Sequence, residues 1–435
     1  MTYLQSICKR LAPRLLLLAA VPGLLVVVVQ HTAAQTYTYS VLYNFPGYTN
    51  DTACPYDSLV VAGGGKYLYG TSAFGGAYGN GTVFELTLGP PVTEKVLYGF
   101  TGGADGDSPI SKVALVKKNL YGTTYHGGAY GYGTVFELTT KGKETVLYSF
   151  TGGADGGYPN AGLVPDSTGT LLYGTTSGGG ADGHGTVFDA PPATGSGYTV
   201  LYSFKGIPDG ASPGGCQGAP AYCSSYGGLL LQKGTLYGTT SYGGDSGCGG
   251  LGCGTVFSLS NTLVETVLYR FGGSSGDGTG PEGTLTRDAK GNLYGATYEG
   301  GAYGYGTVFK LTPSGTEQVL YSFTGGPDGA WPDTSLLLIK GNLYGTAYGG
   351  GDSGCDPGGG ARGCGVIFEL TPSKGGVWTE TVLHTFEWGD GAFPGGGGLV
   401  KDAHGNLYGA ASNGGTSNVN CYNIGCGVVF KLTPN

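Results

Sequence analysis

Aspartate recurs along the sequence in one motif, in which proline follows four residues later. The seven residues are Asp51, Asp105, Asp155, Asp209, Asp277, Asp328 and Asp390. If the fold brings their carboxylates to one surface, they could bind a cation such as Ca²⁺ or the hydroxyl groups of a glycan. Six of the seven precede glycine, and Asp-Gly also forms turns in which the carboxylate accepts backbone N–H groups. We prefer the turn interpretation and keep the aspartates as candidate ligand-binding residues.

Tyrosine between glycines is the second candidate binding motif. Tyr78, Tyr130 and Tyr303 each lie in a Gly-Gly-Ala-Tyr-Gly segment, and Tyr132 and Tyr305 follow two of them. Exposed rings on such segments could stack on sugars or contact a protein partner. The alternative, which we favour, is that the rings pack against a neighbouring part of the fold.

Residues for catalysis are scarce. His126 and His184 could meet Asp182 at a metal ion, but histidines in loops are usually solvated, and we expect no metal site. The glycine-rich strings lack the strand-to-helix setting of a phosphate-binding loop, and no nucleophile can be identified. We therefore expect no catalytic residues and no cofactor, with Ca²⁺ as the single ion that the aspartates could take. Three glutamates that recur at one position are interpreted as structural: Glu85, Glu137 and Glu369.

Eight cysteines form four couples that are close in the sequence. The couples are Cys216 with Cys223, Cys248 with Cys253, Cys355 with Cys364, and Cys421 with Cys426. Disulfides that staple glycine-rich loops are the expected state in an oxidising compartment. Zinc is the alternative, but the second couple alone approaches the spacing of zinc ligands. Cys54 lies apart from the couples, and the sequence leaves open whether it keeps a thiol or joins another chain.

The elements that carry these residues come from an internal repeat. Leu-Tyr-Gly occurs seven times, and so do Gly-Thr-Val-Phe and Val-Leu-Tyr-x-Phe or their close variants. A looser apolar segment precedes each Leu-Tyr-Gly. Short β-branched or aromatic segments bounded by glycine, aspartate, asparagine or proline are typical of strands. In the second unit these segments are residues 113–116, 120–122, 133–136 and 146–150, which we name strands A, B, C and D of a unit.

Four antiparallel strands in each of seven units predict an all-β protein, a seven-bladed β-propeller. The repeats begin with a D strand at residues 41–45 and finish with a C strand at residues 428–433. The N-terminal strand is therefore expected to complete the last blade and close the ring. Antiparallel order places the B-to-C loops and the D-to-A loops, with their tyrosines and aspartates, on one face. A solenoid or a pair of smaller propellers is the alternative architecture.

Composition agrees with a folded β protein. Glycine and proline number 92 and 22 of 435 residues, but the chain is also 40% hydrophobic and 12% aromatic, which argues against disorder. So much glycine disfavours helices. The formal net charge of −8 makes nucleic acid and anionic membranes poor partners. We expect a monomer.

Residues 1–34 have the pattern of a secretory signal peptide. Lys9, Arg10 and Arg14 precede an apolar run that ends in small residues. We expect cleavage after Ala34, a single propeller domain over residues 35–435, and a secreted or periplasmic protein with no membrane contact beyond the export signal. An uncleaved membrane anchor is the alternative.

The repeat unit resembles the GloVer tandem repeat of exported bacterial proteins. It reads Leu-Tyr-Gly-Thr-Thr, then Gly-Gly, then Gly-Thr-Val-Phe-Glu-Leu-Thr, then Val-Leu-Tyr-Ser-Phe, and the resemblance covers residues 38–433. It implies a propeller whose biochemical role is unassigned. The paired glycines after strand B are also similar, more distantly, to kelch propellers.

Seven near-identical units favour an exported, non-enzymatic binding or scaffold propeller whose loop face recognises glycan or protein partners. A secreted carbohydrate-active enzyme with a site at the mouth of the axial channel is the alternative. Catalysis normally needs one blade to differ chemically from the others. In this sequence the visible differences are the cysteine-containing loops.

Overall fold

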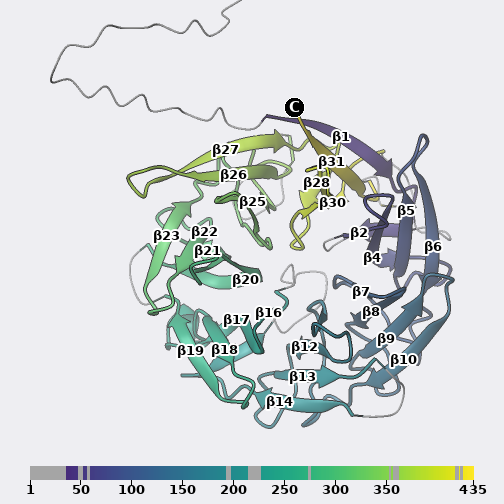
Figure 1. Ribbon diagram of the computed structural model, residues 1–435, viewed down its shortest axis with the longest axis horizontal. Helices are drawn as coiled ribbons and strands as arrows, with labels where there is room; N and C mark the ends of the chain where they lie inside the picture. Colours follow the sequence, from purple (N-terminus) through teal and green to yellow (C-terminus); the bar gives the residue numbers. More distant parts are fainter. Residues whose placement is uncertain are drawn as a thin grey trace, which may run out of the picture. The chain divides into compact units, whose positions relative to one another are not determined.

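Seven antiparallel sheets are arranged around one axis in the unit Thr36–Asn435, as Figure 1 shows. Within each sheet the strands follow one another in the order A, B, C and D. The predicted seven-bladed propeller is confirmed. Among the residues that the structure describes, no helix is long and apolar enough to cross a membrane.

The computed structural model describes residues 36–47, 52–55, 59–192, 197–213, 227–272, 276–351, 354–355, 362–416, 421 and 425–435. Three predictions lie outside these described residues: the signal peptide over residues 1–34, the candidate ligand-binding residue Asp51, and the disulfide between Cys216 and Cys223.

The first four blades take up the first half of the ring. Blade 1 contains β2 (Thr52–Pro55), β3 (Val60–Ala62), β4 (Tyr67–Gly75), β5 (Thr82–Thr87) and β6 (Thr93–Gly99). Blade 2 contains β7 (Ala114–Val116), β8 (Asn119–Thr124), β9 (Thr134–Thr139) and β10 (Glu144–Ser149). Blade 3 contains β11 (Val164–Pro165), β12 (Leu172–Thr176), β13 (Thr186–Ala190) and β14 (Thr199–Ser203). Blade 4 contains β15 (Gly210–Pro213), β16 (Leu230–Gln232), β17 (Thr235–Gly243), the 3₁₀ turn η2 (Cys248–Gly250), β18 (Thr255–Leu259) and β19 (Glu265–Arg270).

The other three blades complete the ring. Blade 5 contains β20 (Gly278–Arg287), β21 (Leu293–Gly300), β22 (Thr307–Leu311) and β23 (Glu317–Ser322). Blade 6 contains β24 (Leu337–Ile339), β25 (Asn342–Ala347), β26 (Val366–Pro372) and β27 (Trp378–Thr385). Blade 7 contains β28 (Ala392–Pro394), β29 (Val400–Lys401), β30 (Leu407–Asn413), β31 (Val428–Pro434) and, from the other end of the repeats, β1 (Tyr37–Asn44).

Strand β1 closes the ring as predicted. It pairs antiparallel with β31 from Tyr37 opposite Pro434 to Asn44 opposite Val428. In Figure 1 the purple β1 lies at the rim beside the yellow β31. The pairing covers the edge of β31, which an open sheet would leave with unpaired backbone groups.

The repeated phenylalanines build the contacts between blades. The strand D phenylalanine of each blade packs edge-to-face on the strand C phenylalanine of the next, with ring centroids 5.0–5.4 Å apart at all seven interfaces. This geometry is favourable for aromatic pairs. In blade 2 the glycine of Leu-Tyr-Gly makes room for the ring, because a Cβ on Gly122 would lie 2.6 Å from Cζ of Phe136.

A backbone contact that we name the blade clasp ties each blade to the preceding one at the loop face. The residue before each repeated proline has a left-handed φ of 53–61°. It donates its N–H, at 2.8–3.0 Å, to the carbonyl oxygen just before the glycine that opens strand C of the preceding blade. A Cβ on that glycine would lie 2.4–2.7 Å from Cδ of the proline. The seven donors are Cys54, Ser108, Tyr158, Ser212, Gly280, Trp331 and Phe393.

The D-to-A segments differ from the expected loops, because each pairs with the far end of strand B. In four blades the pairing forms part of a strand, β2, β15, β20 or β28. In the other three it is a single bridge, such as Asp107 opposite His126. The physical reason is that backbone N–H and C=O groups beyond the aspartate turn need partners once they are buried.

Candidate functional site

The aspartates of the loop face are held within their own turns. The described ones accept hydrogen bonds from backbone N–H groups, as Asp105 does from Thr101 at 2.8 Å. Five of them also accept a bond from the strand D tyrosine, at 2.8–3.1 Å. Asp390 instead lies 3.0 Å from Nε2 of His384. A ligand for these carboxylates would therefore have to compete with the turn.

A glutamate from the next blade stands beside four of these aspartates. Burial, together with the charge of the neighbouring aspartate, raises the pKa of each glutamate to about 7. The pairs are Glu144 with Asp105, Glu265 with Asp209, Glu317 with Asp277, and Glu380 with Asp328. At the other two described interfaces with such an aspartate, tyrosine takes this place and donates to a backbone carbonyl, as Tyr39 does to Asp390 at 2.7 Å.

The tyrosines of the B-to-C loops fall into two groups. Tyr78, Tyr130 and Tyr303 are 63%, 62% and 61% exposed, so our favoured interpretation, packing against a neighbouring blade, is wrong for them. It holds for the other two: Tyr132 contacts Tyr158, and Tyr305 contacts Trp331, both of the next blade. The reason is position, because the exposed rings sit at the loop tip and the packed ones beside the blade clasp.

Three of the four predicted disulfides are present among the described residues. They join Cys248 to Cys253, Cys355 to Cys364 and Cys421 to Cys426. The second cysteine of each supplies the carbonyl oxygen of a blade clasp. The disulfides thus fix the loops at the point where the next blade docks, and they indicate an oxidising environment.

The fourth predicted disulfide differs from these three in its place in the sequence. Cys216 and Cys223 follow strand β15, in the D-to-A segment of blade 4, whereas the other couples lie in B-to-C loops. Both Cys216 and Cys223 lie outside the described residues. The pairing of Cys216 with Cys223 therefore stays a prediction from sequence spacing.

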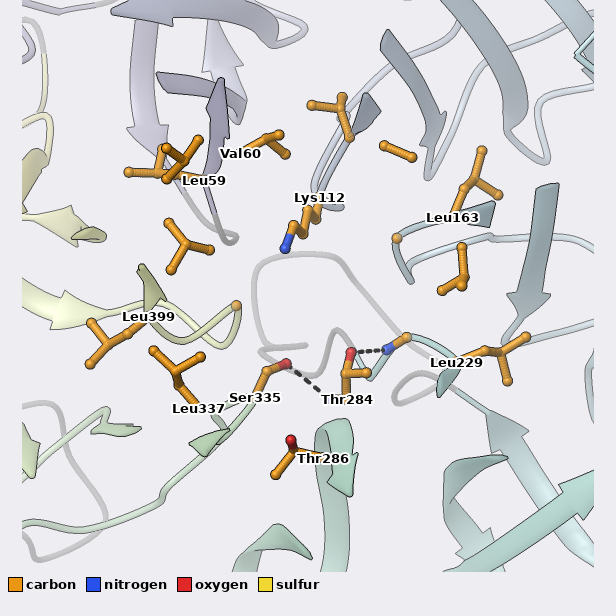
Figure 2. A pocket seen from close by; sticks show the side chains of 18 of the residues that line it. Leu59, Val60, Lys112, Leu163, Leu229, Thr284, Thr286, Ser335, Leu337 and Leu399 are labelled. Carbon is orange, nitrogen blue, oxygen red and sulfur yellow. Dashed lines mark hydrogen bonds between the residues drawn. The ribbon is translucent and has the colours of Figure 1, made fainter. Parts of the chain in front are cut away.

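The axial channel runs along the seven A strands and encloses about 690 Å³. Figure 2 shows its leucine and valine side chains, with Lys112 pointing into the opening. Thr284 Oγ1 accepts a bond from the Gly228 N–H, and Ser335 Oγ accepts one from the Thr284 N–H, both at 2.9 Å. Among the described residues that line it, none is aspartate, glutamate or histidine. The described lining residues of the channel therefore do not supply the carboxyl pair that glycoside hydrolysis needs.

The residue that follows each repeated proline varies in type from blade to blade, and sequence reasoning missed this variation. It is Ile110 in blade 2, buried against Ala73 and Tyr125, but Asn160, Glu282 and Asp333 in blades 3, 5 and 6. All three polar side chains are buried and have atoms without a hydrogen-bond partner among the described residues. Aligning the units at the proline would have exposed this variation.

Glu282 lines a pocket of about 250 Å³ between blades 4 and 5. Burial and the charge of Glu299 raise the pKa of Glu282 to about 8. Burial and the charge of Glu282 also hold the pKa of Asp333 well above its usual range. Blades 5 and 6 therefore carry buried carboxyl groups at this position, although the sequence alone pointed only to the cysteine-containing loops.

The sequence matches the model of the Gloeobacter/Verrucomicrobia repeat over residues 26–227, 172–357 and 251–435. The chain belongs to the Gloeobacter/Verrucomicrobia repeat family. This bears out the resemblance drawn from the repeat motifs. A comparison with curated proteins found no match.

Solved structures resemble this Gloeobacter/Verrucomicrobia repeat protein in fold. The WD40 β-propeller domain of Doa1 has a TM-score of 0.51 at 11% identity, over 92% of this chain and 98% of that one. The PQQ-bound aldose sugar dehydrogenase of Streptomyces coelicolor has a TM-score of 0.48 at 14% identity, over 92% and 99%. Identity this low shows the propeller fold alone and carries no activity over to the Gloeobacter/Verrucomicrobia repeat protein.

Proposed function

We propose that this protein is an exported, non-enzymatic propeller that binds glycans through the tyrosines of its loop face. The observation that carries the proposal is the exposure of Tyr78, Tyr130 and Tyr303, each more than 60%. Tyrosine is enriched at contact surfaces, because its ring combines an apolar face with a hydroxyl group. Export through the signal peptide at residues 1–34 fits the disulfides, which need an oxidising compartment.

The loop geometry suits sugars. Each ring follows Gly-Gly-Ala and precedes a glycine with a left-handed φ, such as Gly131 at 85°, so little beside the ring obstructs its faces. A tyrosine ring offers an apolar face for the C–H groups of a sugar and a hydroxyl for its polar groups. Tyr78 and Tyr130 come from adjacent blades, so that one oligosaccharide could contact both.

A glycan panel with the exported protein tests the proposal. We expect binding of at least one glycan, and a loss of about 1 kcal/mol, or about fivefold in affinity, for each of Tyr78→Ala, Tyr130→Ala and Tyr303→Ala that contacts it. Tyrosine-to-phenylalanine variants should keep most of the affinity. Val264→Ala and Val377→Ala, which remove exposed apolar side chains from turns on the opposite face, are the matched controls.

Two results with glycans would contradict the proposal. One is glycan binding that survives the triple alanine variant unchanged, which would place the glycan elsewhere. The other is turnover of a bound glycan, which would make the protein an enzyme. Binding to an extracellular protein that the triple variant loses, with no glycan bound, would assign the tyrosines to a protein partner instead.

A further inference from the structure

The pocket between blades 4 and 5 contains polar groups that the fold leaves unused. Its lining includes Ser241, which is 6% exposed, and Glu282, which is 9% exposed. Neither Ser241 Oγ nor Glu282 Oε2 has a hydrogen-bond partner among the described residues. Buried polar atoms without a partner are rare and destabilising. Ser241 lies on β17 of blade 4, whereas Glu282 lies on β20 of blade 5. Unpartnered polar atoms therefore line the pocket from both blades.

The pocket is acidic. Glu282 and the exposed Glu299 both line it, and no lysine or arginine is among its described lining residues. Asp333 adds a third carboxyl close to Glu282, on the blade 6 side. Burial and the nearness of these carboxyl groups raise the pKa of Glu282 and of Asp333, and an anionic ligand such as a phosphate or a uronic acid would add to the repulsion. A cation would instead relieve the repulsion.

The size of the pocket and its walls select the kind of cation. Tyr242 and Tyr298 form part of the lining, and aromatic rings attract organic cations through their π faces. The volume of about 250 Å³ far exceeds that of a bare ion. Among the described residues, no three histidine, cysteine, aspartate or glutamate side chains converge to hold a metal. An organic cation therefore fits better than Ca²⁺.

We propose that this pocket binds an organic ammonium group carried by a molecule the size of one sugar ring, as in an amino sugar. The ammonium lies between Glu282 and Glu299 and against the faces of Tyr242 and Tyr298. Ser241 Oγ and Thr279 are placed to bond the hydroxyl groups of the ligand. None of the three exposed tyrosines lines this pocket, so either proposal can fail without the other.

Calorimetric titration of the full exported protein with glucosamine and with glucose tests the assignment. The two sugars differ in one group, an amine in place of a hydroxyl. We expect glucosamine to bind at least tenfold more tightly than glucose. Choline, which carries a permanent charge and no N–H donor, separates the two sources of affinity: binding shows that the tyrosine faces suffice, and failure shows that N–H bonds to the carboxylates are needed. The glucosamine result decides whether the site binds an ammonium group, and the choline result then shows which contacts supply the affinity.

The variants localise the site. Glu299→Gln should weaken glucosamine binding at least tenfold, and Ser241→Ala should weaken it less. Glu299 is exposed, so its replacement leaves folding intact even if Glu282→Gln does not. Glu387→Gln, which removes the charge of another exposed glutamate of the loop face, should change nothing.

Three outcomes would overturn the proposal. They are equal binding of glucose and glucosamine, binding of neither, and glucosamine binding that Glu299→Gln leaves intact. Binding of Ca²⁺ to the metal-free protein that Glu299→Gln abolishes, without glucosamine binding, would assign the pocket to a metal instead. The triple tyrosine variant tests only the glycan proposal for the loop face. It should bind glucosamine as tightly as the original protein does.

Discussion

The backbone N–H of Cys54 donates to the carbonyl oxygen of Cys426 at 2.9 Å, across 372 residues of sequence. The bond lies at the loop face, between blade 1 and blade 7. It closes the ring a second time, because β1 and β31 already pair within blade 7. The ends of the repeat array are therefore held at two places.

Deletion of residues 36–45 removes β1 and should destabilise the whole ring rather than one blade. The deletion exposes the edge of β31 and removes Phe45, whose ring packs on Phe84 of blade 1. We expect a large fall in the melting temperature or failure to fold, measured by thermal unfolding with circular dichroism. A cooperative melt at the original temperature would show that the ring does not depend on β1.

The blade clasp predicts that alanine substitution costs different amounts of stability at two glycines that lie two residues apart. Gly133 and Gly131 have φ values of 93° and 85°, but a Cβ on Gly133 would lie 2.7 Å from Cδ of the clasp proline Pro159 and 2.3 Å from the Thr124 carbonyl oxygen, whereas one on Gly131 meets nothing within 4 Å. Gly131→Ala should cost about 1–2 kcal/mol from the backbone conformation alone. Gly133→Ala should cost about 1–3 kcal/mol more from the clash. Urea unfolding measures both, and equal costs would show that the close packing of Gly133 against Thr124 and Pro159 adds nothing.

The glutamates between blades predict that stability falls as the pH rises. Glu144, Glu265, Glu317 and Glu380 have pKa values of about 7 in the folded protein, above the ordinary value of 4.5. A raised pKa stabilises the folded state fully below the unfolded pKa, and this stabilisation is lost as the pH rises through the folded pKa. The melting temperature should therefore fall between pH 5 and pH 8.

Replacing these four glutamates by glutamine supplies the control for the pH experiment. Glutamine keeps the shape of the side chain and does not titrate, so the slope between pH 5 and pH 8 should flatten. Because Glu282 and Asp333 also have raised pKa values, some slope should remain. A fourfold variant with the slope of the original protein would assign the pH dependence to other groups.

The disulfide of blade 6 should stabilise the protein by constraining the unfolded chain. Replacing Cys355 and Cys364 together by alanine should cost about 2–3 kcal/mol in the chain-entropy account of short loops. Urea unfolding of the variant and of the original protein, each with and without a reducing agent, measures the effect. The reductant should lower the stability of the original protein more than that of the variant. No effect of the reductant on either protein would contradict a structural role.

The fold is predictable from the sequence because each motif occurs seven times, so that an error in one unit is corrected by the others. The same reliance on shared motifs conceals the pocket between blades 4 and 5. Glu282 and Asp333 break the pattern at one position in single units, and a search for shared motifs passes over such departures. The exposure of Tyr130 and the burial of Tyr132 depend on how the next blade docks, which no local pattern encodes.

The blade clasp has a consequence for how this ring can change over generations. Its donor and acceptor are backbone atoms, so the side chain of the donor residue takes no part in the bond. That residue is cysteine, serine, tyrosine, glycine, tryptophan or phenylalanine in different blades, always with the same left-handed backbone. The side chain at each of these seven positions can therefore be exchanged without loss of the backbone hydrogen bond between the blades. Most of these side chains are buried, so an exchange there changes the packing between two blades while the hydrogen bond that joins them is kept.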